Sequence, residues 1–221
     1  VYPRGMGRGD SRTVKVRKKG SKRGSYKKGE DRKDTILDAA YNLLINSGYY
    51  NLSLRKIADS AGISIGNLQY YFPSKDMLVE AMLDRVIQGY LDSFIEIRRH
   101  GTPQEQFLAI IEEVITDLGT KHTTVFFPEL WSLSNHQKGV TKAMDAMYDR
   151  YRQVLVDIIC DMNPALSADQ ARRLALFISS SIEGHTVFIG YRKPWNKETG
   201  NLVKMAQQSF LWLVMEGEIP A

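Results

Sequence analysis

Apolar residues recur at helical spacing along most of the chain, and no segment alternates in the way that a half-buried strand requires. From Glu30 onward, glycine and proline interrupt the sequence at intervals that match the lengths of helices. The 221 residues are 43% hydrophobic, which is enough apolar material for one or two packed domains. The sequence therefore predicts an all-α protein.

Cap residues and helix breakers predict where nine helices begin and end. Ser53, Ser64 and Ser74 suit the N-caps of three early helices, and Thr102 and Ser167 each start a capping box. Three short helices precede one long one, and five more follow. The expected ranges are about 31–47, 54–61, 65–72, 75–100, 103–120, 122–135, 137–162, 168–190 and 199–216.

The stretch from Ser53 to Lys75 carries two short helices joined by a tight turn, which is the layout of a helix-turn-helix. Ala58 and Ala61 are small where the two helices cross, and Gly62 can adopt the left-handed conformation of the turn. The second helix is then free to enter a groove of DNA, where amide side chains can bond base edges. The expected contacts to DNA are Ser53, Arg55, Ser64, Ile65, Gly66, Asn67 and Gln69, with Tyr70, Tyr71 and Lys75 at phosphates.

Residues 53 to 78 read Ser-x-x-x-Ile-Ala-x-x-Ala-Gly-x-Ser-x-Gly-x-Leu-x-x-Tyr-Phe-x-x-Lys-x-x-Leu. This pattern resembles the DNA-binding domain of TetR-family transcriptional regulators. The likeness is close over residues 31–78, and the remainder bears a faint likeness to BetI-type C-terminal domains. Gln69 and Tyr70 depart from the family, which usually has Tyr and His there, so the operator sequence stays open.

The resemblance implies a three-helix bundle with the helix-turn-helix over residues 30–75 and a six-helix domain for effector binding and dimerisation over residues 76–221. It also implies a homodimer built from the last two helices of each subunit. The residues expected at that interface are Leu174, Phe177, Ile178, Ser181, Ile182, Leu202, Met205, Phe210 and Leu213. These apolar stripes could equally form intrachain core, because periodicity alone does not distinguish the two.

The resemblance further implies a pocket for a small molecule among the fourth to eighth helices. Aromatic residues with polar tips suit a largely apolar cavity with a few directional bonds. The candidates are Phe126, Phe127, Trp131, Tyr148, Tyr151, His185, Phe188, Tyr191 and Trp195. Each could equally be ordinary core. A cage for a cation built from Trp131, Tyr148 and Tyr151 is conceivable, although the sequence does not show that the three converge.

Positive charge is concentrated at the N-terminus. Residues 1–29 hold 11 Lys and Arg and one acid, whereas the rest of the chain holds 19 bases and 24 acids. The segment is rich in glycine and lacks apolar periodicity, so we expect a disordered arm. Such an arm could attract DNA phosphates, or it could be a solvated tail or sequence from an upstream reading frame.

Several function classes find no support in the sequence. No apolar run is long enough for a membrane span or a secretory signal, so we expect a soluble protein of the cytoplasm without a membrane partner. The single cysteine, Cys160, excludes an internal disulfide. Metal-binding, nucleotide-binding and acyl-transfer motifs are absent, so we expect no enzyme, no metal and no cofactor.

These features together predict a repressor that binds a palindromic operator of double-stranded DNA as a homodimer and is released by an unidentified small-molecule effector. The alternative is an effector-independent DNA-binding regulator whose C-terminal domain serves only dimerisation or protein docking. An all-α enzyme would need a titratable pair in the cavity. His185 and Glu183 are close in sequence, but residues two apart on a helix point in different directions.

Overall fold

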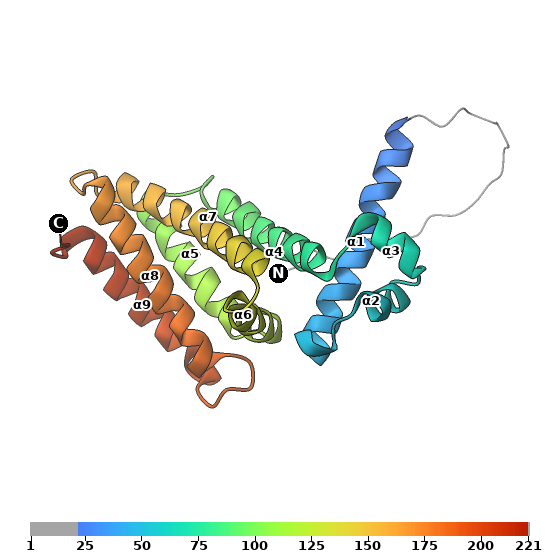
Figure 1. Cartoon of the computed structure of the whole chain (residues 1–221). Coiled ribbons are helices and arrows are strands. Elements are labelled where there is room, and N and C mark those ends of the chain that lie inside the picture. Colours follow the sequence, from blue (N-terminus) through green and yellow to red (C-terminus); the bar gives the residue numbers. More distant parts are fainter. Residues whose placement is uncertain (1–21, 221) are drawn as a thin grey trace, which may run out of the picture.

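The computed structural model describes residues 22–220, which form nine α-helices and two 3₁₀-helices without a strand (Figure 1). The prediction of an all-α fold is confirmed. Within this range, no helix combines the length and the apolarity needed to cross a membrane. The elements are α1 (Lys22–Ser47), η1 (Tyr49–Asn51), α2 (Leu54–Ser60), α3 (Ile65–Tyr71), α4 (Lys75–Ile97), α5 (Pro103–Leu118), α6 (Lys121–Ser134), α7 (Lys138–Met162), α8 (Ala168–Ile189), η2 (Asn196–Glu198) and α9 (Thr199–Glu216).

The predicted cap residues are present at the starts of five helices. The hydroxyls of Ser53, Ser64 and Ser74 each accept a hydrogen bond from the backbone N–H three residues later. Thr102 and Ser167 form complete capping boxes. An N-cap of this kind stabilises a helix by about 1 kcal/mol. The starts of α2, α3, α4, α5 and α8 therefore follow from local sequence.

Helix α1 begins at Lys22, nine residues before the start expected near Asp31. The expected disordered arm over residues 1–29 is therefore wrong for residues 22–29, which are helical, and the rest of the arm lies outside the described residues. A helix that is already anchored by buried side chains can grow by one residue at a time without a new nucleus. Lys and Arg are also good helix formers, so extension needs no apolar face.

Helices α1, α2 and α3 pack together at one end of the molecule (Figure 1). Ile36, Leu44, Ile57 and Leu68 are fully buried between them or against their neighbours. Gly62 joins α2 to α3 with a φ of 66°, which lies in the left-handed region that favours glycine. The helix-turn-helix thus forms where the sequence predicts it.

Replacing Gly62 by alanine is expected to lower the free energy of unfolding by about 1 kcal/mol, because an L side chain is strained at this φ. Apart from its chain neighbours, nothing lies within 4 Å of an added Cβ, so the backbone alone carries the effect. Urea unfolding measures the loss. Gly89→Ala, in α4 and equally unobstructed, is the matched control and should be neutral or stabilising. Equal stability of the two variants would contradict the prediction.

Helix α4 links this unit to the remaining helices. It packs against α1 near its start and against α7 and α5 along its length (Figure 1). Helix α7 also contacts α6 and α8, and α5 packs against α8 and α9. The buried side chains form one continuous core from Ile36 in α1 to Val214 in α9. A displacement of α4 would therefore be felt at both ends of the molecule.

Candidate DNA-binding surface and ligand cavity

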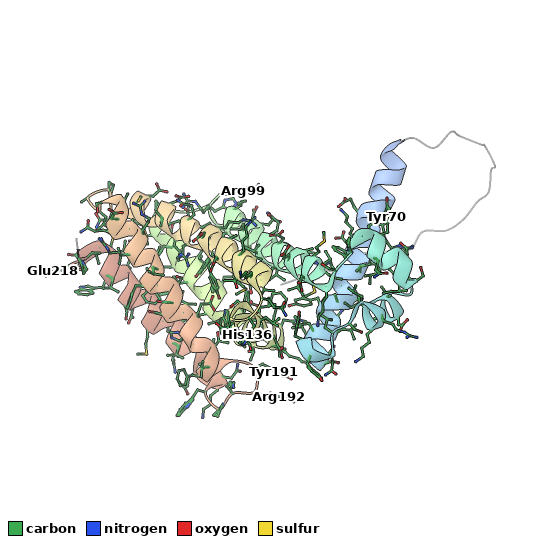
Figure 2. The ribbon with its side chains drawn as sticks, in the orientation of Figure 1. Tyr70, Arg99, His136, Tyr191, Arg192 and Glu218 are labelled. Carbon is green, nitrogen blue, oxygen red and sulfur yellow. The ribbon has the colours of Figure 1, made fainter. Side chains whose placement is uncertain are left out.

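Helix α3 presents small and polar residues to solvent. Its fully buried residue is Leu68, which fixes the helix to the core. Tyr70 is 81% exposed and lies at the opposite end of the molecule from Glu218 (Figure 2). The exposed residues of the predicted set on this helix and its cap are Ser64, Ile65, Gly66, Asn67, Gln69 and Tyr70. An exposed helix with amide side chains has the form needed to read base edges in a major groove.

Three further predicted contacts are Ser53 and Arg55 at the start of α2 and Tyr71 at the end of α3. Ser53 and Arg55 are exposed. Tyr71 is half-buried, and its ring stands edge-on to that of Tyr70 with the centroids 5.1 Å apart. The packing of these two rings orients the C-terminal turn of α3 and leaves the phenol of Tyr70 in solvent.

Lys75 occupies a different environment from the expected phosphate contact. Its ammonium donates a hydrogen bond to the carbonyl oxygen of Tyr49 at 3.1 Å, and the nitrogen lies 3.5 Å from the centroid of that tyrosine ring. Partial burial lowers the pKa of Lys75, and Asp76 opposes this effect. Lys75 therefore ties the start of α4 to the turn after α1, which sequence reasoning did not foresee.

Tyr49 also contacts the C-terminal helices. Its backbone N–H donates a hydrogen bond to Oε2 of Glu129 in α6 at 3.1 Å. Its hydroxyl lies 3.1 Å from Nε2 and 3.2 Å from Oε1 of Gln137, which precedes α7. The elements η1, α4 and α6 and the N-cap of α7 thus meet at one residue, Tyr49. We call Tyr49, Lys75, Glu129 and Gln137 the Tyr49 junction.

A cavity lies among α4, α5, α6, α7 and α8, where the resemblance places a pocket. The space open to a water-sized probe is about 40 Å³, so a ligand with an apolar body requires the lining side chains to move apart. Aromatic rings make up much of its wall. The lining residues are Ile87, Tyr90, Phe94, Val114, Leu118, Thr123, Phe127, Met147, Tyr148, Tyr151 and Glu183.

Three of the predicted ligand contacts, Phe127, Tyr148 and Tyr151, line this cavity. Trp131 supports them, because its Nε1–H donates a hydrogen bond to the hydroxyl oxygen of Tyr148 at 2.8 Å. Phe126 is fully buried and packs toward α1 rather than into the cavity. Tyr148 and Tyr151 thus share the cavity, whereas Trp131 stands behind Tyr148 and is not one of the lining residues.

The structure places the other four predicted ligand contacts outside the cavity. Phe188 and Trp195 are more than half exposed, and Tyr191 lies in the loop after α8 (Figure 2). His185 follows Glu183 by two residues, so it lies about 200° further around the helix. A backbone carbonyl of the same helix contacts its Nδ1 at 2.6 Å. Aromatic character alone does not determine which face of a helix is turned inward.

The polar end of the cavity was not predicted from the sequence. The carboxylate of Asp117 accepts hydrogen bonds from the hydroxyls of Tyr90 and Thr123. Burial, and next the charge of Asp117, raises the pKa of Tyr90 far above its usual range. The available signal was an acid on a helix face that is otherwise apolar, since Asp117 lies three residues after the buried Val114. Among the described side chains, residues 29–220, no three metal-ligating groups gather in one place.

Glu183 is the acid of the cavity wall. Burial raises the pKa of Glu183 from 4.5 to about 7, and a hydrogen bond with Tyr148 opposes the shift. Burial, and next the charge of Glu183, raises the pKa of both Tyr148 and Tyr151. Oε2 of Glu183 and the hydroxyl of Tyr151 are buried without a hydrogen-bond partner in the described part of the chain. Buried polar atoms of this kind are rare and call for an explanation.

Helices α8 and α9 carry two apolar faces rather than one. Four of the expected dimer contacts, Leu174, Ile178, Ile182 and Phe210, are buried within the chain and belong to its core. Ser181, Leu202 and Leu213 are half-buried, and Phe177 and Met205 are exposed. The exposed large apolar residues, which we call the α8–α9 face, are Leu176, Phe177, Val187, Phe188, Met205, Trp212 and Met215. An exposed apolar surface of this kind marks an interaction site.

Comparison with known proteins finds relatives for both parts of the chain. Residues 36–82 match the family model described as bacterial regulatory proteins of the tetR family. Residues 103–203 match the model described as the C-terminal domain of BetI-type transcriptional repressors. One relative, an HTH-type transcriptional regulator from the dhlA 5′ region of Xanthobacter autotrophicus, is 28% identical over 159 residues, which cover 70% of this chain and 77% of the relative.

Two solved structures share the fold. A TetR transcription regulator from Haloarcula marismortui aligns with a TM-score of 0.69 at 20% identity, covering 86% of this chain and all of the other. A transcriptional regulator from Saccharomonospora viridis in complex with choline aligns with a TM-score of 0.67 at 20% identity, covering 87% of this chain and 100% of the other. At this level of identity the comparisons establish the architecture.

Proposed function

The chain belongs to the TetR family of bacterial regulatory proteins, and we propose that it is a cytoplasmic repressor that binds a palindromic operator as a homodimer and leaves it when a small molecule binds. The family consists of DNA-binding transcriptional regulators and not of enzymes. The observation that carries the proposal is the cavity, because α4 lines it and begins next to α3. A ligand in the cavity thus touches the helix that positions the DNA-binding surface.

Helix α3 is the proposed recognition helix. In a dimer, two such helices would enter successive major grooves about one helical turn, or roughly 34 Å, apart. The amides of Asn67 and Gln69 are exposed and suit bidentate bonds to adenine. Gly66 has no side chain to hold the backbone away from the duplex. These features support sequence-specific reading of a symmetric operator.

The α8–α9 face is the proposed dimer interface. Its residues on α8, taken together with the exposed Ser180 and Gly184 between them, recur at intervals of three or four. Small residues in such a stripe allow two helices to approach closely. A second copy of the same face is the simplest partner for it, because most homo-oligomers form through self-complementary surfaces.

Replacing Phe188 by arginine is expected to weaken the dimer by about 2 kcal/mol, because a charge would be buried at the interface in place of an aromatic ring. Phe188 is 61% exposed in one chain, so the subunit itself should fold normally. Sedimentation velocity across a dilution series measures the change. Ile95→Arg, at an exposed position of α4, is the control. An equal effect of both variants, or of neither, would rule out this interface.

Helix α4 is the proposed path from ligand to DNA. It contributes Ile87, Tyr90 and Phe94 to the cavity, and it begins at Lys75, four residues after the end of α3. A shift of α4 would change the distance between the two recognition helices of a dimer. Moving the population from mostly DNA-competent to mostly incompetent requires about 5 kcal/mol of preference for the second state. The choline-bound relative of similar fold supports ligand binding in a domain of this kind.

The Tyr49 junction gives this path a specific test. Tyr49→Ala removes the ring beneath Lys75 and the hydroxyl contact with Gln137, while the backbone bonds to Lys75 and Glu129 remain. We therefore expect the ligand-induced loss of operator affinity to shrink by about fivefold, or about 1 kcal/mol of coupling. Ligand affinity itself should change little, because Tyr49 does not line the cavity. Tyr50→Ala is the control, since Tyr50 is 97% exposed. Unchanged coupling in Tyr49→Ala would place the path elsewhere.

A metabolite and drug library screened by thermal unfolding, followed by operator binding for each hit, tests the proposed function. A ligand that binds only the folded state raises the melting temperature by mass action. We expect at least one hit that also releases operator DNA. Hits that never affect DNA binding, or no hit across a broad library, would favour the effector-independent regulator, in which the C-terminal domain serves dimerisation or docking alone.

A further inference from the structure

Glu183 carries a carboxylate oxygen, Oε2, that is buried and has no hydrogen-bond partner among the side chains described, residues 29–220. The carboxyl group is hydrogen-bonded to Tyr148, whose hydroxyl oxygen accepts the Nε1–H of Trp131 at 2.8 Å. An unsatisfied buried acceptor costs about 1–3 kcal/mol, and more when it is charged. A group held at this cost in a cavity wall is a candidate for ligand contact.

Asp117 is a second carboxylate beside the cavity, and the protein itself supplies its hydrogen-bond donors. It accepts hydrogen bonds from the hydroxyls of Tyr90 and Thr123. The protein thus supplies two hydroxyl donors to Asp117 but only Tyr148 to Glu183, whose Oε2 has no donor. Asp117 therefore links α4, α5 and α6, whereas Oε2 of Glu183 is available to a ligand.

The wall around Glu183 favours a positive charge. Of the described residues that line the cavity, none is Lys, Arg or His. Arg152, whose charge acts on Tyr148, lies outside the lining and is paired with Asp149. The rings of Phe127, Tyr148 and Tyr151 present π-faces or edges to the same space, and a cation is attracted to such faces. The low polarity of the site strengthens its attraction to the carboxylate. An anionic ligand would meet repulsion.

The hydroxyl oxygen of Tyr151 is the second buried atom without a partner, and it restricts the class of ligand further. The hydroxyl of Tyr151 is buried, lines the cavity and has no hydrogen-bond partner in the described range. It can accept a hydrogen bond, as Oε2 of Glu183 can, so the two atoms suit a ligand with more than one donor hydrogen. A quaternary ammonium has the charge but no such hydrogen.

We propose that the cavity binds a protonated amine with an apolar body, whose ammonium group donates hydrogen bonds to Oε2 of Glu183 and to the hydroxyl oxygen of Tyr151. The inference rests on the proposed function only in taking the cavity as the effector site. The apolar body lies against the aromatic wall, and the ammonium replaces the donor that the fold does not supply.

Calorimetry of the full chain without DNA, at about pH 8, tests this ligand class. The probes are phenethylamine, phenethyl alcohol, phenylacetate and phenethyltrimethylammonium, within a panel of alkyl and arylalkyl amines. We expect the best amine to bind at least about tenfold more tightly than its alcohol, carboxylate and trimethylammonium counterparts. Equal or tighter binding of any counterpart would overturn the proposal. So would the absence of binding by every amine at about 1 mM.

Variants assign the effect to the named atoms. Glu183→Gln should weaken amine binding about 30-fold and leave the affinity for phenethyl alcohol within a factor of about two, which also shows that the cavity is intact. Glu112→Gln, at an exposed position of α5, should change neither. Amine binding that is unaffected by Glu183→Gln would contradict the assignment. Amine binding without operator release would contradict the proposed gating and leave the ligand class standing.

Discussion

Replacing Asn67 and Gln69 together by alanine is expected to weaken operator binding by about 1000-fold, or about 4 kcal/mol, because each amide that reads a base contributes about 1–3 kcal/mol. Both side chains are exposed on α3, and neither fills the core. The melting temperature should therefore stay close to that of the wild type, since surface substitutions away from packed regions change stability by about 0.5 kcal/mol or less.

Fluorescence anisotropy with an operator selected from random duplexes by the wild-type protein measures this loss. The paired substitution of Asn42 and Gln104, exposed residues of α1 and α5, is the control for removing two surface amides. We expect the control to bind like the wild type. Retained affinity in the α3 variant would show that another surface reads the DNA.

Glu183→Gln is expected to stabilise the ligand-free protein by about 3 kcal/mol at pH 8 and to change little near pH 4.5. The pKa of Glu183 is raised from 4.5 to about 7 in the folded chain, so between these values the folded state holds a proton that the unfolded state has released. Stability contributed by this proton is present below pH 4.5 and is lost as the pH rises through about 7. Glutamine is neutral at every pH, so the variant keeps its stability as the pH rises.

Other carboxylates do not change the sign of the difference in free energy of unfolding between Glu183→Gln and the wild type, because they titrate in both. In the described part of the chain, Tyr148 of α7 acts directly on Glu183, Tyr151 of α7 and Tyr90 of α4 line the same cavity, and Arg152 of α7 acts on Tyr148. Urea unfolding of wild type and variant at the two pH values measures the change. A variant that is less stable than the wild type at pH 8 would show that the carboxylate is stabilised by its surroundings.

Helix boundaries could be predicted from the sequence because their causes are local. Ser53, Ser64, Ser74, Thr102 and Ser167 each satisfy a backbone N–H within three residues, so the signal and the structure lie in the same few positions. The helix-turn-helix was predictable for the same reason. The start of α1 was not, because extension of an anchored helix leaves no cap or apolar pattern to detect.

The ligand cavity could be predicted only in part. Phe127, Tyr148 and Tyr151 follow from aromatic residues on faces that are also apolar. Glu183 could not be found by a search for aromatics, since it looks like a solvated acid until the packing of α7 and α5 on α8 buries it. His185 was misplaced because its environment depends on which face of α8 turns inward.

The dimer surface shows the same limit. Periodicity identifies apolar stripes on α8 and α9 but does not say which stripe the chain itself covers. Ile178 and Ile182 are fully buried within the subunit, whereas Leu176 and Val187, on the neighbouring face, remain exposed. Tertiary packing determines which stripe becomes core and which stays exposed as an interface. No short sequence motif reveals this.

Operator affinity of the wild-type protein, measured by anisotropy with and without a saturating ligand of the cavity, tests the central claim most directly. A ligand that occupies the space beside α4 should lower the affinity at least tenfold, and Glu183→Gln should need about 30-fold more phenethylamine for the same effect if the ligand is an amine. A ligand that binds at the cavity and leaves operator affinity unchanged would contradict the claim that this cavity controls DNA binding.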